Sequence, residues 1–469
     1  MNSNFSRVAG LGGLLAATWF VGQLASQHAA AADSAKRPNI LFLFTDDQRA
    51  DTVGALGNPA IKTPALDSLV ERGFSFANAY CLGGNMPAVC TPSRNMLLSG
   101  KAYFRWQGPL APGEAPNFPL SFRDAGYQTY HHGKRGNTAL NIQAQFEINK
   151  YVDENIERTS GEPARLVIDD AIAFLESRDD ERPFCMYLAF GNPHDPRIAA
   201  QKYLDLYEPR QIPLPKNYLP LHPFDNGDMT LRDERLAPWP RTEQEIRRQL
   251  HEYYAVISGM DFHIGRLLET LRKLKLEENT LVVFSSDQGL AMGSHGLMGK
   301  QNLYEAGMKV PLVFAGPGVP HGRSDALVYL LDIYPTLCDL VGAKIPAGLD
   351  GVSFAGVLAG KTQTARRELF FAYRDVQRAL RDDRWKLIRY PQVDITQLFD
   401  LRTDPDEIHD LAADPAQSAR VKDMLARLAA EQKNFGDSLP LTVEHPKPAA
   451  WRPPPPESPK PGKKAQEAN

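Results

Sequence analysis

Residues 37–51 read RPNILFLFTDDQRAD, and this stretch carries the clearest signal for the fold. The run 39–44 is apolar without alternation, which is typical of a central strand in a parallel sheet covered on both faces. Two adjacent acids, Asp46 and Asp47, follow the run. We therefore expect a buried parallel strand with two carboxylates at its carboxyl end.

The order of strand and helix recurs along the chain. A helix is predicted between Pro64 and Gly73, and an apolar strand-like run follows it directly. Two further units, in which a helical pattern precedes a strand-like run, cover residues 164–194 and 260–289. This repetition predicts an α/β fold in which a large, mostly parallel sheet is sandwiched by helices.

The sequence changes in character after residue 365. Short strand-like segments with turns follow, and a helix is predicted near residues 415–434. We predict a catalytic domain at 33–365 and a smaller C-terminal α+β domain with an antiparallel sheet at 366–440. Residues 441–469 are rich in Pro and Lys, which predicts a disordered tail.

The N-terminal residues differ from the rest of the chain. Arg7 precedes a mostly apolar stretch, and Ala30 and Ala32 fit the small-residue rule for cleavage. We predict a signal peptide at residues 1–32 and a secreted or periplasmic protein, with an uncleaved anchor as the alternative. No later segment is apolar for long enough to span a bilayer. The net charge of −3 gives no general case for nucleic-acid binding.

Four cysteines are too few for a disulfide scaffold, and they lack the spacing of a zinc site. One bridge among Cys81, Cys185 and Cys338 is possible, and burial of these three as free thiols is equally possible.

Three apolar runs end in polar clusters, and ligands gather at the carboxyl ends of strands in α/β folds. Asp46 and Asp47 end one run, and Asp287 and Gln288 end another. Three carboxylates brought together repel one another unless a cation lies between them. Oxygen ligands of this kind suit Ca²⁺, with Mg²⁺ possible, better than zinc. The alternative is that these residues are helix caps or turn residues.

Three cationic or imidazole side chains lie in polar stretches rich in Gly or Pro, namely Lys134, His194 and Lys300. Cations beside a carboxylate-bound metal suit an anionic substrate such as a sulfate or phosphate ester. Taken singly, each side chain is more often a solvated surface charge or a satisfied core histidine, and their clustering at the expected strand ends favours the functional interpretation.

Residues 90–100, CTPSRNMLLSG, place Cys90 at the start of an apolar, helix-like run. On a helix beginning at Pro92, Arg94 returns to the same side as Cys90, and a cysteine so placed has a lowered pKa. This favours a reactive cysteine over a core one. A cysteine nucleophile needs a histidine base, however, and a hard-metal site needs oxygen where the chain offers sulfur.

CTPSRNMLLSG resembles the signature of the type I, formylglycine-dependent sulfatase family, within the alkaline-phosphatase-like superfamily. That signature reads Cys-x-Pro-Ser-Arg, three residues, then Leu-Thr-Gly, and Ser99 stands here in place of Thr. The resemblance extends from PNILFLFTDDQR through SDQG, SHGLMGK and GPG to LFDLRTDPDE. It implies that a formylglycine-generating or anaerobic sulfatase-maturing enzyme oxidises Cys90 to formylglycine, whose hydrate presents one hydroxyl to the metal and one to the substrate.

The resemblance also assigns a role to each candidate residue. Arg94 steadies the formylglycine, Lys134 and Lys300 clamp the sulfate oxygens, and His194 contacts substrate, with His295 near it. The implied calcium ligands are Asp46, Asp47, Asp287, Gln288 and the modified Cys90. The implied activity is hydrolysis of sulfate monoesters, on a sulfated polysaccharide or oligosaccharide, through a covalent sulfated intermediate.

The sequence departs from the family at Gly136. The family usually has histidine there, as in GKWH, and this chain has GKRGN. That histidine helps to deprotonate the formylglycine hydrate, so His131 or His132 takes its place here, or turnover is impaired. Two alternatives stay open: a phosphate or phosphonate monoesterase on the same scaffold, and a carbohydrate-binding relative that has lost turnover.

Overall fold

The structure is a computed structural model that describes Met1 and residues 37–455. The predicted signal peptide, apart from Met1, and residues 456–469 of the predicted tail lie outside the described residues. The chain from Asn39 onward forms one compact unit, and the description below concerns that unit.

The described residues form a nine-stranded sheet whose order is β10-β2-β9-β7-β1-β6-β4-β5, with β8 paired to β2. Its strands are β1 (Asn39–Asp46), β2 (Phe74–Tyr80), β4 (Gln128–Gly133), β5 (Ile148–Tyr151), β6 (Phe184–Pro193), β7 (Thr280–Ser286), β8 (Lys309–Val310), β9 (Leu312–Ala315) and β10 (Gly322–Tyr329). β1 is parallel to both neighbours, β6 and β7, whereas β9 is antiparallel to β7 and β2. The predicted α/β fold with a large, mostly parallel sheet sandwiched by helices is confirmed, and the antiparallel pairings β2–β8, β2–β9 and β7–β9 make the sheet mixed.

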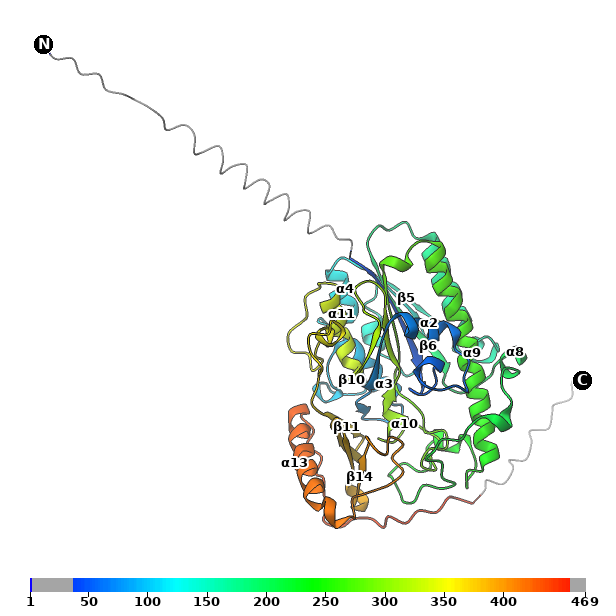
Figure 1. Ribbon diagram of the computed structural model, residues 1–469, viewed down its shortest axis with the longest axis vertical. Helices are drawn as coiled ribbons and strands as arrows, with labels where there is room; N and C mark the ends of the chain where they lie inside the picture. The colour runs from blue at the N-terminus through cyan, green and yellow to red at the C-terminus, as the bar shows by residue number, and fades with distance from the viewer. Residues whose placement is uncertain (2–36, 456–469) are drawn as a thin grey trace, which may run out of the picture. The chain divides into compact units, whose positions relative to one another are not determined.

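β1 separates two hydrophobic cores. All eight of its residues are buried. Phe42 and Phe44 enter one core, which α3, α4 and α11 cover, while Leu41 and Leu43 enter the other, which α2, α7 and α9 cover (Figure 1). Both faces of the strand are therefore apolar, as its unalternating sequence predicts.

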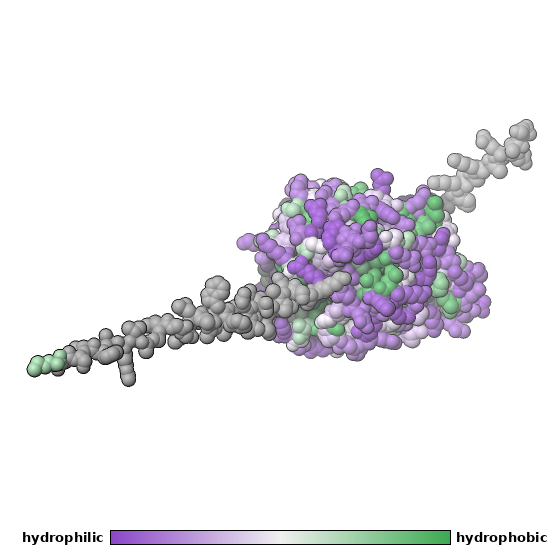
Figure 2. All heavy atoms as spheres, turned by 90° about the horizontal axis from the view of Figure 1, so that it is seen from above, coloured by the Kyte–Doolittle hydropathy of each residue, from purple (hydrophilic) through white to green (hydrophobic). Residues whose placement is uncertain are grey.

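The α-helices other than α13, which packs beside the second sheet, flank this sheet or connect its strands. Their bounds are α2 (Pro64–Arg72), α3 (Cys90–Ser99), α4 (Phe118–Asp124), α5 (Leu140–Gln143), α6 (Glu154–Thr159), α7 (Arg165–Ser177), α8 (Gln201–Leu204), α9 (Glu243–Lys273), α10 (Glu305–Met308), α11 (Ile333–Leu340), α12 (Ala355–Leu358) and α13 (Ser418–Phe435). In the described part of the chain, no helix combines the length and the apolar character needed to cross a membrane. Hydrophilic side chains cover most of the face seen in Figure 2.

A second sheet of five described strands has the order β14-β13-β12-β11-β3. Its strands are β3 (Gly83–Gly84), β11 (Leu369–Tyr373), β12 (Gln377–Arg381), β13 (Trp385–Tyr390) and β14 (Ile395–Asp400). The last four pair antiparallel, and α13 packs beside them through the stacked rings of Phe370 and Phe435 (Figure 1). This is the predicted C-terminal α+β domain, and β3 ties it to the segment that leads into Cys90.

The chain returns to the body after α13. Ala449 accepts a hydrogen bond from the amide of Asp225, and the ring of Trp451 lies edge-on to Trp239 at 5.9 Å. Ala449 and Trp451, which belong to the predicted tail, are therefore packed against the rest of the described chain.

The four cysteines are all buried and free. Cys81, Cys185 and Cys338 thus form no disulfide, and burial as free thiols is the alternative that the structure supports.

Candidate functional site

The carboxyl ends of β1 and β7 bring the predicted acids together. Thr45 lies opposite Ser286 in the parallel register, so the residues that follow each strand become neighbours. The amide of Asp47 donates to Asp287 Oδ1 at 3.0 Å. Asp47 adopts φ 67°, the left-handed region, and this sharp turn lets two adjacent acids converge where an extended strand would separate them.

Helix α3 delivers Cys90 and Arg94 to the same point. Cys90 Sγ lies 3.1 Å from Asp46 Oδ1, and Arg94 Nε donates to Asp287 Oδ2 at 2.8 Å. A second guanidinium nitrogen of Arg94 donates to the carbonyl of Thr45 at 3.1 Å. The helix begins at Cys90, two residues before the predicted start, and every one of its residues is buried.

The predicted lowering of the Cys90 pKa is wrong. Burial, followed by the charges of Asp287 and Asp46, raises the pKa of Cys90 well above its ordinary value. The reason is that Asp287 engages the guanidinium of Arg94, so the positive charge is already compensated. The thiol therefore stays protonated rather than becoming a thiolate nucleophile.

Four of these side chains form a cluster that can hold a metal ion. One ligand atom from each of Asp46, Asp47, Cys90 and Asp287 lies within 4.8 Å of the others, and all four residues are buried. Burial and the neighbouring carboxylate of Asp46 raise the pKa of Asp287 to about 7. Such a cluster lowers its own repulsion by binding a cation.

Gln288 contacts two members of this cluster. Its amide nitrogen contacts Asp47 Oδ1 at 2.5 Å and Cys90 Sγ at 3.0 Å. Its Oε1 is buried and has no hydrogen-bond partner among the described residues. The amide nitrogen therefore faces the carboxylates, and a half-turn of the amide would bring the unpartnered oxygen there, where a hard divalent cation prefers an oxygen ligand.

Two buried lysines balance the carboxylates. Lys134 Nζ pairs with Asp46, and Lys300 Nζ lies 2.8 and 2.9 Å from the two oxygens of Asp47 and 3.1 Å from Cys90 Sγ. Burial alone lowers the pKa of Lys300, but the negative charge of Asp47 raises it to well above its ordinary value. Both ammonium groups point into the cluster, where they can contact an anion.

His194 follows β6 and faces the same cluster. Its Nε2 lies 3.7 Å from Asp47 Oδ2, and its Nδ1 lies 2.7 Å from the carbonyl of Asp195. A carbonyl only accepts, so Nδ1 carries the proton and Nε2 is free to accept. Burial and the charge of Lys300 lower the pKa of His194, which keeps the imidazole neutral.

Family models match most of this chain. The model described as Sulfatase matches residues 38–343, well over half of the 469 residues. This chain belongs to the sulfatase family. A second model, described as N-sulphoglucosamine sulphohydrolase, C-terminal, matches residues 293–434. The predicted family is confirmed, and the sulfatase match spans Asp46, Asp47, Cys90 and Asp287.

Among curated relatives of this sulfatase is an N-acetylglucosamine-6-O-sulfatase of Bacteroides thetaiotaomicron, 26% identical, with 87% of this chain and 88% of that protein covered. A structure solved in complex with its substrate D-glucosamine-2-N,6-O-disulfate matches with a TM-score of 0.72 and 23% identity, over 87% of this chain and 100% of that one. A phosphonate monoester hydrolase of Agrobacterium radiobacter matches with a TM-score of 0.73 and 22% identity, over 85% and 96%. At these identities, the two structures show a shared fold.

The sulfatase does not bring His131 or His132 to the cluster. His131 Nδ1 lies 2.7 Å from Asn149 Oδ1, and its ring stacks on Tyr187. His132 points the other way, with Nδ1 3.5 Å from Asp170 of α7. Burial lowers the pKa of His131 to about 3 and that of His132 to about 4, so both rings are neutral.

His295 lies in the same loop as Lys300, five positions before it. Its ring stacks on Tyr304 at 3.8 Å between centroids, and its Nε2 lies 3.0 Å from Asn217 Nδ2. The described contacts of the ring are with Tyr304, Asn217 and Glu407 rather than with the carboxylates of the metal-binding cluster.

Glu154 occupies the space beside Gly136. The amides of Arg135 and Gly136 both donate to Glu154 Oε1, at 2.7 and 2.6 Å. A Cβ added at Gly136 would meet that oxygen at 3.3 Å, and Arg158 holds the carboxylate at 2.8 Å. A larger side chain at this position therefore requires Glu154 to move.

Sequence reasoning missed residues that fix the acids from a distance. The hydroxyl of Tyr253 in α9 donates to the carbonyl of Asp47 at 2.5 Å and accepts from the amide of Arg49. These partners are about two hundred positions apart, so no local spacing could have revealed the contact.

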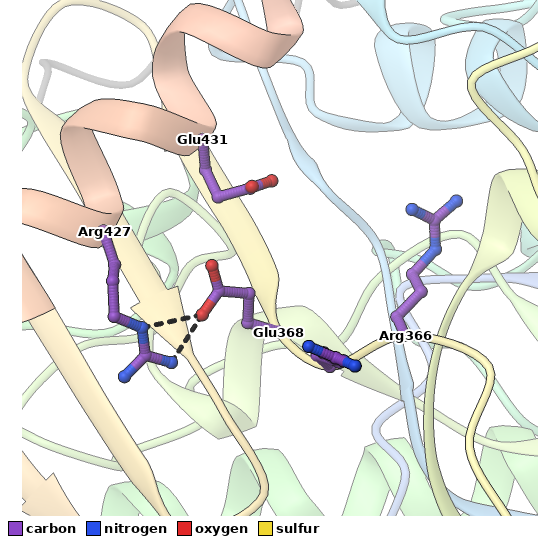
Figure 3. Close-up of a pocket in the computed structure, with 5 residues that line it drawn as sticks. Arg366, Glu368, Arg427 and Glu431 are labelled. Atoms are coloured by element: carbon purple, nitrogen blue, oxygen red, sulfur yellow. Dashed lines mark hydrogen bonds and ion pairs between the residues drawn. The ribbon is translucent and has the colours of Figure 1, made fainter.

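A cavity of ≈ 550 Å³ elsewhere in the sulfatase shares no residue with this cluster (Figure 3). Its lining residues are Arg366, Arg367, Glu368, Arg427 and Glu431. Arg427 pairs with Glu368, and Arg366 pairs with Asp332, so most of its charge is already compensated. The cavity is thus lined largely by ion-paired side chains and lies between α13 and the start of β11.

Proposed function

We propose that this sulfatase hydrolyses sulfate monoesters on a sulfated polysaccharide or oligosaccharide, with formylglycine made from Cys90 and with calcium as its metal. The position of Cys90 carries the proposal. Its sulfur lies among three carboxylates and Lys300, where a hard-oxygen site needs an oxygen. Oxidation replaces H₂S by one oxygen on the same carbon and so provides it.

Asp46, Asp47, Asp287, Gln288 and the oxidised Cys90 would hold the calcium. Bound calcium supplies Lewis-acid stabilisation of negative charge on the sulfate oxygens. The hydrated formylglycine supplies a hydroxyl nucleophile and a second hydroxyl that lets sulfate depart.

The side chains of this chain bind and orient the ester. The ammonium groups of Lys134 and Lys300 bind sulfate oxygens and offset charge as the S–O bond breaks. Lys300 stays protonated, so its Nζ can give a proton to the leaving alcohol oxygen. His194 Nδ1 donates its proton in a hydrogen bond to the carbonyl of Asp195. Its Nε2 is therefore free to accept a hydrogen bond from a substrate hydroxyl.

The sugar is suggested by the relatives. One of them is named an N-acetylglucosamine-6-O-sulfatase, and one structural neighbour was solved with a disulfated glucosamine. Sulfated glucosamine oligosaccharides are therefore the first substrates to test. The leader sequence supports export, and the mature N-terminus of the secreted protein, read by mass spectrometry, tests it.

Peptide mass spectrometry around Cys90 tests the proposal, on enzyme made with and without a formylglycine-generating enzyme. We expect activity to follow the fraction of Cys90 that has lost H₂S and gained oxygen. Active enzyme that retains an unmodified Cys90 thiol contradicts the proposal.

A phosphonate or phosphate monoesterase is the second candidate, favoured by the shared fold of a phosphonate monoester hydrolase. Paired 4-nitrophenyl sulfate, phosphate and phenylphosphonate esters discriminate among them on one preparation. Tight binding of a sulfated sugar without sulfate release would instead indicate a relative that has lost turnover.

A further inference from the structure

A buried carboxylate holds the loop that carries Lys300. Glu234 lies in the short helix η4 (Asp233–Leu236) and is 3% exposed. Its Oε1 accepts from the amide of Gly299 at 2.8 Å, and its Oε2 accepts from the amide of Met298 at 3.0 Å. The two residues directly before Lys300 are thus bonded to one side chain.

Asp233 holds the loop from the other side of Lys300. Gln301 Nε2 donates to Asp233 Oδ2 at 2.8 Å and to the carbonyl of Pro87 at 2.9 Å. Gln301 Oε1 accepts from the amide of Lys300 at 3.1 Å. Pro87 lies three positions before Cys90, so these bonds join η4, the Lys300 loop and the segment leading into α3.

The packing leaves no room for a side chain at Gly299. A Cβ added at Gly299 would lie 2.3 Å from Gln301 Oε1 and 3.0 Å from Asp233 Cβ. On its far side, the loop is bonded to itself, because the amide of Ala291 donates to the carbonyl of Gly299 at 3.0 Å. The backbone of Lys300 is therefore fixed on two sides, while its Nζ reaches Asp47.

Holding a loop with the buried carboxylate of Glu234 costs free energy, which suggests that the exact position of the loop matters. A buried carboxylate is costly unless it is paired and hydrogen-bonded. Among the described residues, its ionic partner is Arg241, at 2.8 Å, and it also accepts from the two loop amides. The bonds of this carboxylate are thus divided between its own segment and the loop of Lys300.

We infer that Asp233 and Glu234 are positioning residues that set the place of the Lys300 ammonium relative to Asp47 and Cys90. The effect on catalysis rests on the proposed role of Lys300 in sulfate binding. The effect on the loop does not, because it is a property of the hydrogen bonds alone.

A double-mutant cycle tests the catalytic part on the formylglycine-containing, calcium-loaded enzyme. Glu234→Ala is expected to lower kcat by about 10- to 100-fold, since small misplacements of a catalytic group cost this much. Glu234→Ala in a Lys300→Ala background is expected to cost under about threefold more, because both changes act through one ammonium group. The control is Glu243→Ala, an exposed acid at the start of α9, which is expected to keep wild-type kcat.

Hydrogen exchange at the amides of Met298 and Gly299 tests the loop without any turnover. We expect at least about tenfold faster exchange in Glu234→Ala and an intermediate rate in Glu234→Gln, which retains one carbonyl oxygen, with no change in Glu243→Ala. If Glu234→Ala does not fold, Glu234→Gln and Asp233→Asn are read by the same two criteria.

Unchanged exchange at these amides in the Glu234 variants overturns the inference, and so do independent, multiplicative losses of kcat in the cycle. A wild-type enzyme without sulfatase activity tells against the proposed function instead, and the exchange rates still decide whether the carboxylate holds the loop.

Discussion

Replacing Lys300 by Met removes the buried ammonium group from the cluster while keeping a side chain of similar length. Lys300 Nζ lies 2.8 Å from Asp47 Oδ1, and its side chain is 3% exposed. At an effective dielectric constant of about 20, two unit charges at this distance attract by about 6 kcal/mol. Desolvation offsets part of this, and removing one partner of a buried pair typically costs about 3–5 kcal/mol. In EDTA, we therefore expect Lys300→Met to lower the free energy of unfolding by about 3–5 kcal/mol.

Adding calcium should then reduce the difference in the free energy of unfolding between Lys300→Met and wild type. In the wild type, Lys300 and the cation compete for the carboxylate of Asp47, whereas in Lys300→Met the cation alone compensates it. A ligand at 100 times its Kd stabilises by about 2.7 kcal/mol, so tighter calcium binding by the variant recovers a measurable part of the loss. Denaturant unfolding of both proteins in EDTA and in calcium gives the four values required.

Lys216→Met is the matched control. Lys216 is an exposed lysine whose Nζ lies 3.4 Å from Asp406, and its loss should cost under about 1 kcal/mol in either buffer. The reasoning is refuted if Lys300→Met costs no more than Lys216→Met in EDTA, or if calcium leaves the gap for Lys300→Met unchanged.

Three further changes test other parts of the structure. Gln288→Ala should weaken calcium binding by at least about tenfold in titration calorimetry, because the proposed donor set includes its amide oxygen; unchanged affinity would remove Gln288 from the site. Arg94→Lys should lower the free energy of unfolding by about 2–4 kcal/mol, since an ammonium cannot keep both the Asp287 and the backbone bonds; a loss under about 1 kcal/mol contradicts this. Burial raises the pKa of Asp261 to about 7, so its folded-state protonation stabilises at low pH and is lost as pH rises from about 4 to 7. Between pH 5 and 8 wild type should therefore lose about 2–3 kcal/mol of unfolding free energy relative to Asp261→Asn, and a difference that is independent of pH would refute this.

The sequence predicts elements well where one pattern dominates. The run 39–44 has no alternation, and the strand it predicts has both faces buried. The helix predicted at 260–274 in fact begins at Glu243, where Thr242 caps it. Its earlier half also carried a signal, because Ile246, Leu250 and Ile257 recur at helical spacing and are all buried.

Sequence reasoning located the site wherever its residues end strands. The acids after β1 and β7 could be predicted because parallel strands deliver their carboxyl ends to one edge. The surroundings of each side chain could not. Whether Arg94 lowers the pKa of Cys90 depends on Asp287, which is 193 positions away and already holds the guanidinium. The ring of His295 lies against Tyr304, although its position in the loop gave no sign of this.

The balance of charge in the cluster bears on which ester it accepts. When Asp46, Asp47 and Asp287 are all ionised, their three negative charges balance the positive charges of Arg94, Lys134 and Lys300, and His194 is neutral. A bound divalent cation ionises its carboxylate ligands and adds two positive charges. One ionised nucleophile and one monoanionic ester then restore neutrality, and an uncompensated charge in such a site is costly. A sulfate or phosphonate monoester carries a single charge, whereas an ionised phosphate monoester carries two. Charge therefore disfavours phosphate monoesters, and the choice between sulfate and phosphonate falls to the contacts of Lys300 and His194 with the leaving group.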